Sequence, residues 1–112
     1  MTNHRLEVLG SLADEIAARR SAAPDQSYTA KLLSGGAETC ARKLGEEAIE
    51  TVLAAMSDDR RHLTSESADL LYHLLVLLEA RQVPLADVMA ELARRQGVSG
   101  LAEKAARSGD RG

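Results

Sequence analysis

The sequence predicts an all-α protein, a bundle of four to five helices. Apolar residues recur at three- and four-residue spacing in several segments, whereas no segment alternates apolar and polar residues with the period of a strand. Proline and glycine divide the chain into lengths that suit helices joined by short connections. At 112 residues the chain can bury one hydrophobic core, so we expect a single domain over residues 1–112.

Three helices are expected in the first half of the chain. Residues 3–20 form an amphipathic segment whose apolar stripe consists of Leu6, Leu9, Leu12 and Ile16. Ser27 has the residue type of an N-cap for a short helix that stops at the Gly35-Gly36 pair. A longer helix is expected at residues 37–56.

Two further helices are expected in the second half. Asp58 or Asp59 can cap a helix at residues 60–82, and Pro84 is well placed at the first position of another at residues 85–96. The glycines that follow predict a partly flexible tail at residues 97–112, with one or two helical turns at 101–107.

The composition narrows the class of partner. Acidic residues outnumber basic ones 17 to 14, and Tyr28 and Tyr72 are the only aromatic residues, so the basic excess and stacking platforms of nucleic-acid binding are missing. The single cysteine, Cys40, excludes an intramolecular disulfide. No apolar run approaches the roughly 20 residues that span a bilayer, and we expect a cytoplasmic protein without a membrane partner.

The segment at residues 66–78 places acids in a helix that is otherwise apolar on nearly every side, which predicts a buried helix. Glu66 and Asp69 are three residues apart, and His73 follows one turn later, all within about 60° of arc. Because isolated carboxylates are costly to bury in their ionised form, a positive partner is expected.

The preceding helix offers more acids in place of that partner, namely Glu46, Glu47 and Glu50, with Lys43 as the one cation on that stripe. If the two helices are antiparallel, Glu47 and Glu50 can face Glu66 and Asp69, which predicts a four-carboxylate site for a divalent cation. Oxygen ligands favour Mg²⁺, with Mn²⁺ as a substitute. A di-iron bundle is disfavoured because no Glu-x-x-His motif accompanies these acids.

Structural explanations compete with the metal site. Glu46, Glu47 and Glu50 could form a solvated face, and Glu66 lies in the half of its helix where the macrodipole favours an acid. Lys43 could pair with Glu47 four residues on. We expect His73 to be a core or interface histidine with satisfied hydrogen bonds, and Cys40 and Met56 to be core residues.

Three segments carry a resemblance to a known family. Residues 27–32 (SYTAKL), 43–50 (KLGEEAIE) and 66–73 (ESADLLYH) resemble the phosphoribosyl-ATP pyrophosphohydrolases of histidine biosynthesis. This family belongs with the MazG-like all-α NTP pyrophosphatases, whose signature is EExxE, a spacer and ExxD. The residues that match this signature are Glu46, Glu47, Glu50, Glu66 and Asp69.

The resemblance implies an enzyme that binds a nucleotide and hydrolyses 1-(5-phosphoribosyl)-ATP to its AMP derivative and pyrophosphate, with Mg²⁺ and as an intertwined homodimer. We expect Glu47, Glu50, Glu66 and Asp69 to hold the metal and Glu46 to orient or deprotonate water. The candidate substrate contacts are Ser27, Tyr28, Thr29, Lys31 and Lys43.

Two other functions remain compatible with the sequence. A house-cleaning nucleoside triphosphate pyrophosphatase of the same superfamily shares the four-acid site but not the base and ribose pocket. A non-catalytic helical dimerisation module needs neither metal nor substrate.

Overall fold

The computed structural model describes residues 4–97, 100, 104–105 and 107, and this part of the chain is built from helices without strands. The five helices are α1 (His4–Arg19), α2 (Tyr28–Ser34), α3 (Gly36–Ala55), α4 (Arg60–Ala80) and α5 (Leu85–Arg95). The all-α prediction is therefore confirmed. The expected flexible tail and its turns fall largely outside the described residues.

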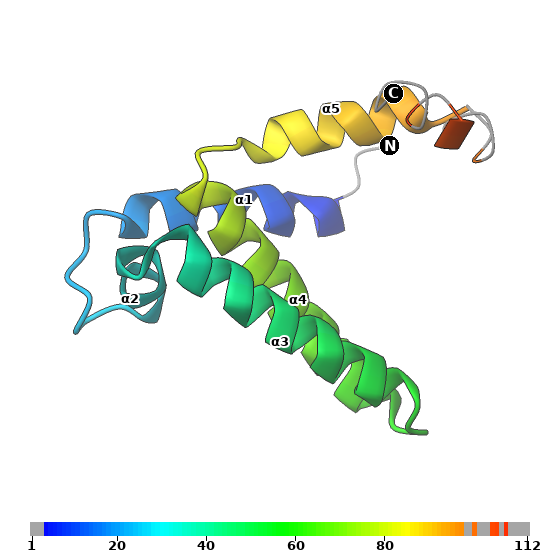
Figure 1. The fold of residues 1–112 in the computed structure, drawn as a ribbon, viewed down its shortest axis with the longest axis horizontal. Helices are drawn as coiled ribbons and strands as arrows, with labels where there is room; N and C mark the ends of the chain where they lie inside the picture. The colour runs from blue at the N-terminus through cyan, green and yellow to red at the C-terminus, as the bar shows by residue number, and fades with distance from the viewer. Residues whose placement is uncertain (1–3, 98–99, 101–103, 106, 108–112) are drawn as a thin grey trace.

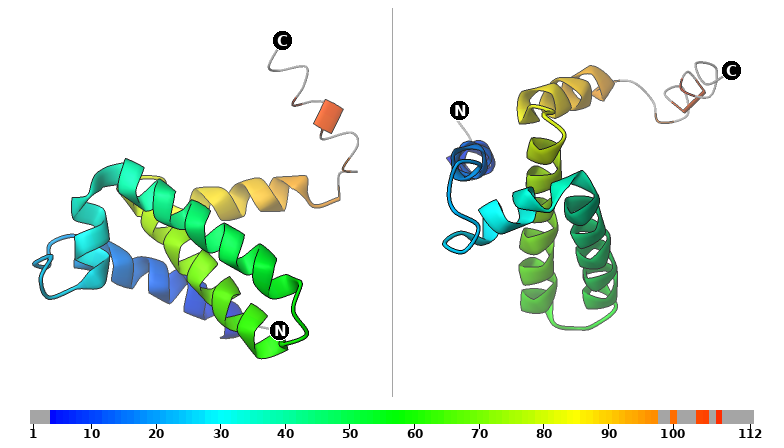
Figure 2. Two further views of the ribbon diagram at one scale, coloured as in Figure 1. Left: turned by 60° about the horizontal axis from the view of Figure 1, so that its bottom comes forward. Right: turned by 60° about the vertical axis from the view of Figure 1, so that its left-hand side comes forward.

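The helices α3 and α4 form a long antiparallel hairpin; they overlap in Figure 1 and lie side by side in the right-hand view of Figure 2. Their turn is closed by the side chain of Asp59, which accepts hydrogen bonds from the amides of Arg61 and His62 at the start of α4. Of the two aspartates that the sequence offered as caps, Asp59 fills the role.

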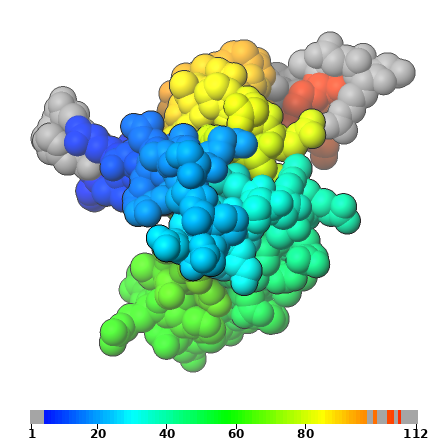
Figure 3. Space-filling model, turned by 90° about the vertical axis from the view of Figure 1, so that its left-hand side faces the viewer, coloured from blue at the N-terminus to red at the C-terminus, as the bar shows by residue number. Residues whose placement is uncertain are grey.

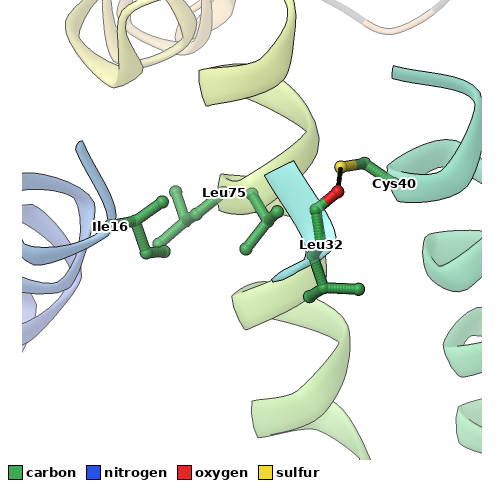
Figure 4. Packing of buried hydrophobic residues seen from close by; sticks show 5 residues of the cluster. Ile16, Leu32, Cys40 and Leu75 are labelled. Atoms are coloured by element: carbon green, nitrogen blue, oxygen red, sulfur yellow. Dashed lines mark hydrogen bonds between the residues drawn. The ribbon is translucent and has the colours of Figure 1, made fainter. Parts of the chain in front are cut away.

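The core lies at one end of the hairpin, where α1 and α2 pack against it. It is formed by the buried side chains of Ile16, Leu32, Cys40, Leu75 and Val76 (Figure 4). The Cys40 thiol donates a hydrogen bond to the carbonyl oxygen of Leu32 at 3.3 Å and so joins α3 to α2. The predicted core position of Cys40 is confirmed.

The connection between α2 and α3 is a single residue, Gly35. Ser27 caps α2 as predicted, since its hydroxyl accepts a hydrogen bond from the Ala30 amide at 3.1 Å. Gly36 has a φ of +80°, a value that side chains strongly disfavour, so the glycine pair turns the chain sharply from α2 into α3. The tight turn fixes α2 beside the hairpin.

The other end of the hairpin projects beyond α1 and α2, as Figure 3 shows in green. Leu71 is 47% exposed and Met56 is 79% exposed, so the predictions of an entirely buried fourth helix and of a core Met56 are wrong for a single chain. The physical reason is that α1 and α2 cover only the end of the hairpin that holds the core.

The fifth helix follows α4 after a short turn and extends to one side of the end of the hairpin that holds the core (Figure 1). Pro84 is the N-cap of α5, one residue before the position predicted for it. None of the described helices combines the length and the apolar character needed to cross a bilayer.

Candidate active site

Three acids meet across the hairpin. Glu47 projects from α3 and Glu66 and Asp69 project from α4, and one carboxylate oxygen of each lies within 4.8 Å of the others. Glu47 and Glu66 are half-buried, whereas Asp69 is exposed. The arrangement offers three oxygen ligands to one cation, with open space on the Asp69 side.

A hydrogen-bonded threonine ties the two helices together at this point. The Thr51 hydroxyl lies 2.8 Å from the carbonyl oxygen of Glu47 in its own helix and 3.2 Å from that of Glu66 across the hairpin. Since both carbonyls belong to residues of the acid cluster, Thr51 fixes the register in which α3 presents Glu47 to α4.

The electrostatics of the cluster show uncompensated negative charge. The pKa of Glu66 is raised above its usual value, first by burial and then by the charges of Glu47, Asp69 and Glu50. His62 opposes this effect weakly, because its Nε2 lies 3.7 Å from a Glu66 oxygen on an exposed part of α4. A cation placed among these carboxylates would offset their charge.

Two of the predicted acids lie apart from this group. Glu50 is exposed and outside the three-acid cluster, although its charge acts on Glu66. Glu46 is also exposed, and one of its oxygens lies 3.2 Å from Lys43 Nζ. The suggested pairing of Lys43 with Glu47 is therefore wrong, because the side chain bonds to the acid three residues on, not four.

His73 lies next to the cluster in a pocket of aromatic rings. Its ring meets those of Tyr28 and Tyr72 edge-on, at centroid distances of 6.2 and 5.0 Å. Its Nε2 lies 3.9 Å from a Glu47 oxygen, and its buried Nδ1 has no hydrogen-bond partner. Burial lowers the pKa of His73. The histidine is buried as expected, but its hydrogen bonds are not satisfied.

Some of the candidate substrate residues are already hydrogen-bonded within the protein, and others are accessible from outside. The hydroxyl of Ser27 caps α2, and that of Thr29 is hydrogen-bonded to the Tyr72 hydroxyl at 2.6 Å. Tyr28 is 54% exposed and stacks on Tyr72 with an interplanar angle of 18°. Tyr28 and Lys31 line a shallow hollow with the turn before α2. The structure thus places Tyr28 beside His73, whose Nε2 lies 3.9 Å from a Glu47 oxygen.

Three residues at the site were not singled out from the sequence: Thr51, His62 and Tyr72. Thr51 lies one turn after Glu47 and His62 one turn before Glu66, so a search of each helix for polar residues four positions from the acids finds both. Tyr72 precedes His73 but lies on a different side of α4, and its contact with Thr29 depends on the packing of α2.

An antiparallel helical hairpin with three facing carboxylates and a neighbouring exposed aromatic ring defines an all-α protein with a site suited to a hard divalent cation. Comparison with known proteins specifies the family. The family model described as phosphoribosyl-ATP pyrophosphohydrolase matches residues 9–96. The chain therefore belongs to the phosphoribosyl-ATP pyrophosphohydrolase family, and it is a hydrolase.

Curated relatives agree with this assignment. A phosphoribosyl-ATP pyrophosphatase of Dinoroseobacter shibae is 59% identical over 102 residues, which cover 91% of this chain and 100% of the relative. The protein of the same name from Ruegeria pomeroyi is 60% identical, over 91% of this chain and 97% of its own. That from Rhizorhabdus wittichii is 62% identical, over 88% and 93%.

Proposed function

We propose that this chain hydrolyses 1-(5-phosphoribosyl)-ATP to 1-(5-phosphoribosyl)-AMP and pyrophosphate, the second step of histidine biosynthesis, in the cytoplasm. The observation that carries the proposal is the convergence of Glu47, Glu66 and Asp69 in a member of this family. In the reaction, the oxygen of water attacks phosphorus, the bond between the α- and β-phosphates breaks, and pyrophosphate leaves.

Mg²⁺ fits the donor set. Glu47, Glu66 and Asp69 are hard oxygen ligands. The pKa of Glu66 is raised first by burial and then by the charges of the neighbouring acids, both of which a bound cation would oppose. Glu50 is proposed as a fourth ligand, since it is one turn from Glu47 and acts on Glu66 electrostatically. Mg²⁺ held by these acids would neutralise charge on the triphosphate and would act as a Lewis acid, and Mn²⁺ is the expected substitute.

The remaining candidates are assigned roles in binding the substrate and activating water. We propose that Glu46 orients the attacking water and accepts its proton, while Lys43, which is bonded to Glu46, contacts the phosphates. Lys31 and Tyr28 line the hollow before α2, where a ribose or phosphate group could lie. Ser27 and Thr29 support this edge of the site through the cap of α2 and the bond to Tyr72.

We propose that the active form is a homodimer. Support comes from α3, where Ile49, Val52, Leu53 and Met56 are each at least 60% exposed and recur at helical spacing. A stripe of this kind on one helix is typical of a face that packs against another helix. A second copy of the hairpin would cover it and extend the bundle.

The substrate assignment is tested by measuring pyrophosphate release from phosphoribosyl-ATP, dATP and dUTP with Mg²⁺ present. We expect phosphoribosyl-ATP to be turned over with the highest kcat/KM. Faster release from dATP or dUTP would favour a house-cleaning pyrophosphatase. No release from any of them, together with no Mg²⁺-dependent thermal shift, would favour a dimerisation module.

The metal assignment is tested with Glu47→Gln and Asp69→Asn, which remove one ligand charge each. We expect helix content by circular dichroism to be unchanged and Mg²⁺-dependent pyrophosphate release to be abolished. In the wild-type chain, Mg²⁺ at 100 times its dissociation constant should raise the free energy of unfolding by about 2.7 kcal/mol. Unchanged turnover in a variant would remove that residue from the mechanism.

A further inference from the structure

One buried polar group near the site has no role in the function described so far. His73 is 5% exposed and is the one buried residue with a polar side chain in the described part of the chain. Leaving a buried hydrogen-bonding atom without a partner costs about 1–3 kcal/mol. An apolar residue at this position would avoid that cost, so the imidazole must supply something that an apolar residue cannot.

The orientation of the ring indicates what it supplies. Nδ1 is enclosed and has no partner, whereas Nε2 faces Glu47 Oε1 at 3.9 Å. In a neutral imidazole one nitrogen carries the proton and the other accepts. At 3.9 Å the contact is longer than a hydrogen bond, but a carboxylate in front of Nε2 favours the tautomer with the proton on that atom and leaves Nδ1 bare.

The surroundings hold the ring in this orientation. Tyr28 and Tyr72 meet it at interplanar angles of 89° and 78°, and Tyr72 is itself fixed by its hydrogen bond to Thr29. Glu47, in contrast, has like-charged neighbours within 4.8 Å that push its carboxylate away from the cluster. A donor from the buried side can hold the carboxylate against this repulsion.

We infer that His73 is a positioning residue, whose Nε2–H holds the Glu47 carboxylate in the orientation needed to share a divalent cation with Glu66 and Asp69. The inference rests on the proposed function, because it takes Glu47 as a metal ligand. Hydrogen-bond partners of metal-binding carboxylates typically change metal affinity or activity by about 10–100-fold when they are removed.

The test uses a matched pair of variants, His73→Gln and His73→Asn. Both place one amide in the same buried position, but the amide of glutamine can reach the place of Nε2, whereas that of asparagine reaches only the place of Nδ1. Binding of Mn²⁺ alone is measured by electron paramagnetic resonance, and pyrophosphate release is measured as a function of Mg²⁺ concentration.

We expect the asparagine variant to bind Mn²⁺ about 10–100-fold more weakly than the wild type. It should need a correspondingly higher Mg²⁺ concentration for half-maximal activity, and the glutamine variant should stay close to the wild type in both measurements. Equal behaviour of the two variants would overturn the role of His73. Absence of Mn²⁺ binding in the wild type would instead overturn the metal site itself.

A measurement on the wild type does not depend on how the variants fold. In a protein labelled with ¹⁵N at histidine, the nitrogen resonances of His73 should report the neutral ring with its proton on Nε2. Addition of Mg²⁺ should shift the Nε2 resonance, because Glu47 changes its bonding. A proton on Nδ1 would overturn the inference, since Nε2 could then donate nothing to Glu47.

Discussion

The surroundings of Glu66 resist the ionisation of its carboxyl. The pKa of Glu66 is raised in the folded chain, and the largest cause is its burial beside Thr51 and Glu47. A carboxyl whose pKa is higher in the folded chain than in the unfolded chain stabilises the fold below its unfolded pKa. That stability is lost as the pH rises through the folded pKa.

We therefore predict that Glu66→Gln raises the midpoint of thermal unfolding of the metal-free chain at pH 7 and lowers the gain that Mg²⁺ produces. The wild type without metal should lose stability as the pH rises above about 4.5, the unperturbed value for this carboxyl, and the variant should lose less. Scanning calorimetry with EDTA or Mg²⁺ measures both effects.

Glu46→Gln is the matched control, because it removes the same charge from an exposed residue that is paired with Lys43. It should not stabilise the metal-free chain. If the Glu66 variant has a lower midpoint of thermal unfolding than the wild type in EDTA at pH 7, the ionised carboxylate is stabilised by other groups of the protein.

Residue spacing predicted the neighbours of Glu66 but not every partner. Glu66 and Asp69 lie three residues apart on one face of α4, and α3 runs antiparallel to α4. These two facts suffice to bring Glu47 to the two acids, as the structure shows. The sequence could not predict whether Lys43 pairs with Glu46 or with Glu47, because residues three and four positions away both lie within reach on a helix surface.

At the level of helices, the hairpin depends on contacts that polar side chains make near the site. Thr51 bonds to the carbonyl of Glu66 in α4, whereas Thr64 bonds only within α4, to the carbonyl of Arg60. Substituting each threonine in turn therefore distinguishes the contribution to stability of a hydrogen bond between helices from that of a hydrogen bond within one helix.

We predict that Thr51→Val lowers the free energy of unfolding by about 0.5–1.5 kcal/mol, because the bond to α4 is lost while the shape of the side chain is retained. Thr64→Val should change it less, since Thr64 is exposed. Urea unfolding followed by circular dichroism gives both values. Equal losses in the two variants would show that the bond between helices contributes nothing.

Helix positions were predictable from periodicity and caps to within one or two residues. The fourth helix was expected to reach residue 82 but ends at Ala80, because Gln82 has a φ of 58° that no right-handed helix accommodates. Such an ending depends on the turn into α5, where Val83 bonds back to Leu78, and sequence periodicity does not report that bond.

For the molecule as a whole, apolar surface exceeds what one chain can bury. Among the described residues, eleven large hydrophobic side chains are exposed, whereas seven hydrophobic residues are buried. Met56 was predicted to lie in the core because it is apolar. Apolar character predicts burial, but it does not tell whether the covering surface belongs to the same chain or to another. The exposed stripe of α3 faces away from α4, so a second copy is the cover that we propose.

We predict that Leu53→Glu converts a homodimer into a monomer, because it places a charge in the middle of the stripe formed with Ile49, Val52 and Met56. Light scattering after gel filtration should give a wild-type mass near twice the 12.0 kDa of one chain and a smaller mass for the variant. Ala18→Glu, which adds the same charge to an exposed position of α1, should leave the mass unchanged.

A monomeric wild type would contradict the proposed assembly. So would a Leu53 variant that keeps the wild-type mass, since a buried carboxylate without a partner is incompatible with a packed helical face.

The short turn between α3 and α4 has a consequence for how the protein folds. The three acids come from helices that are adjacent in the chain, so bringing them together requires the closure of one small loop and little loss of chain entropy. Contacts between sequence neighbours generally form early and quickly. We therefore expect the repulsion among the three acids to arise early in folding, and we expect cations in the surrounding solution to speed folding by relieving it.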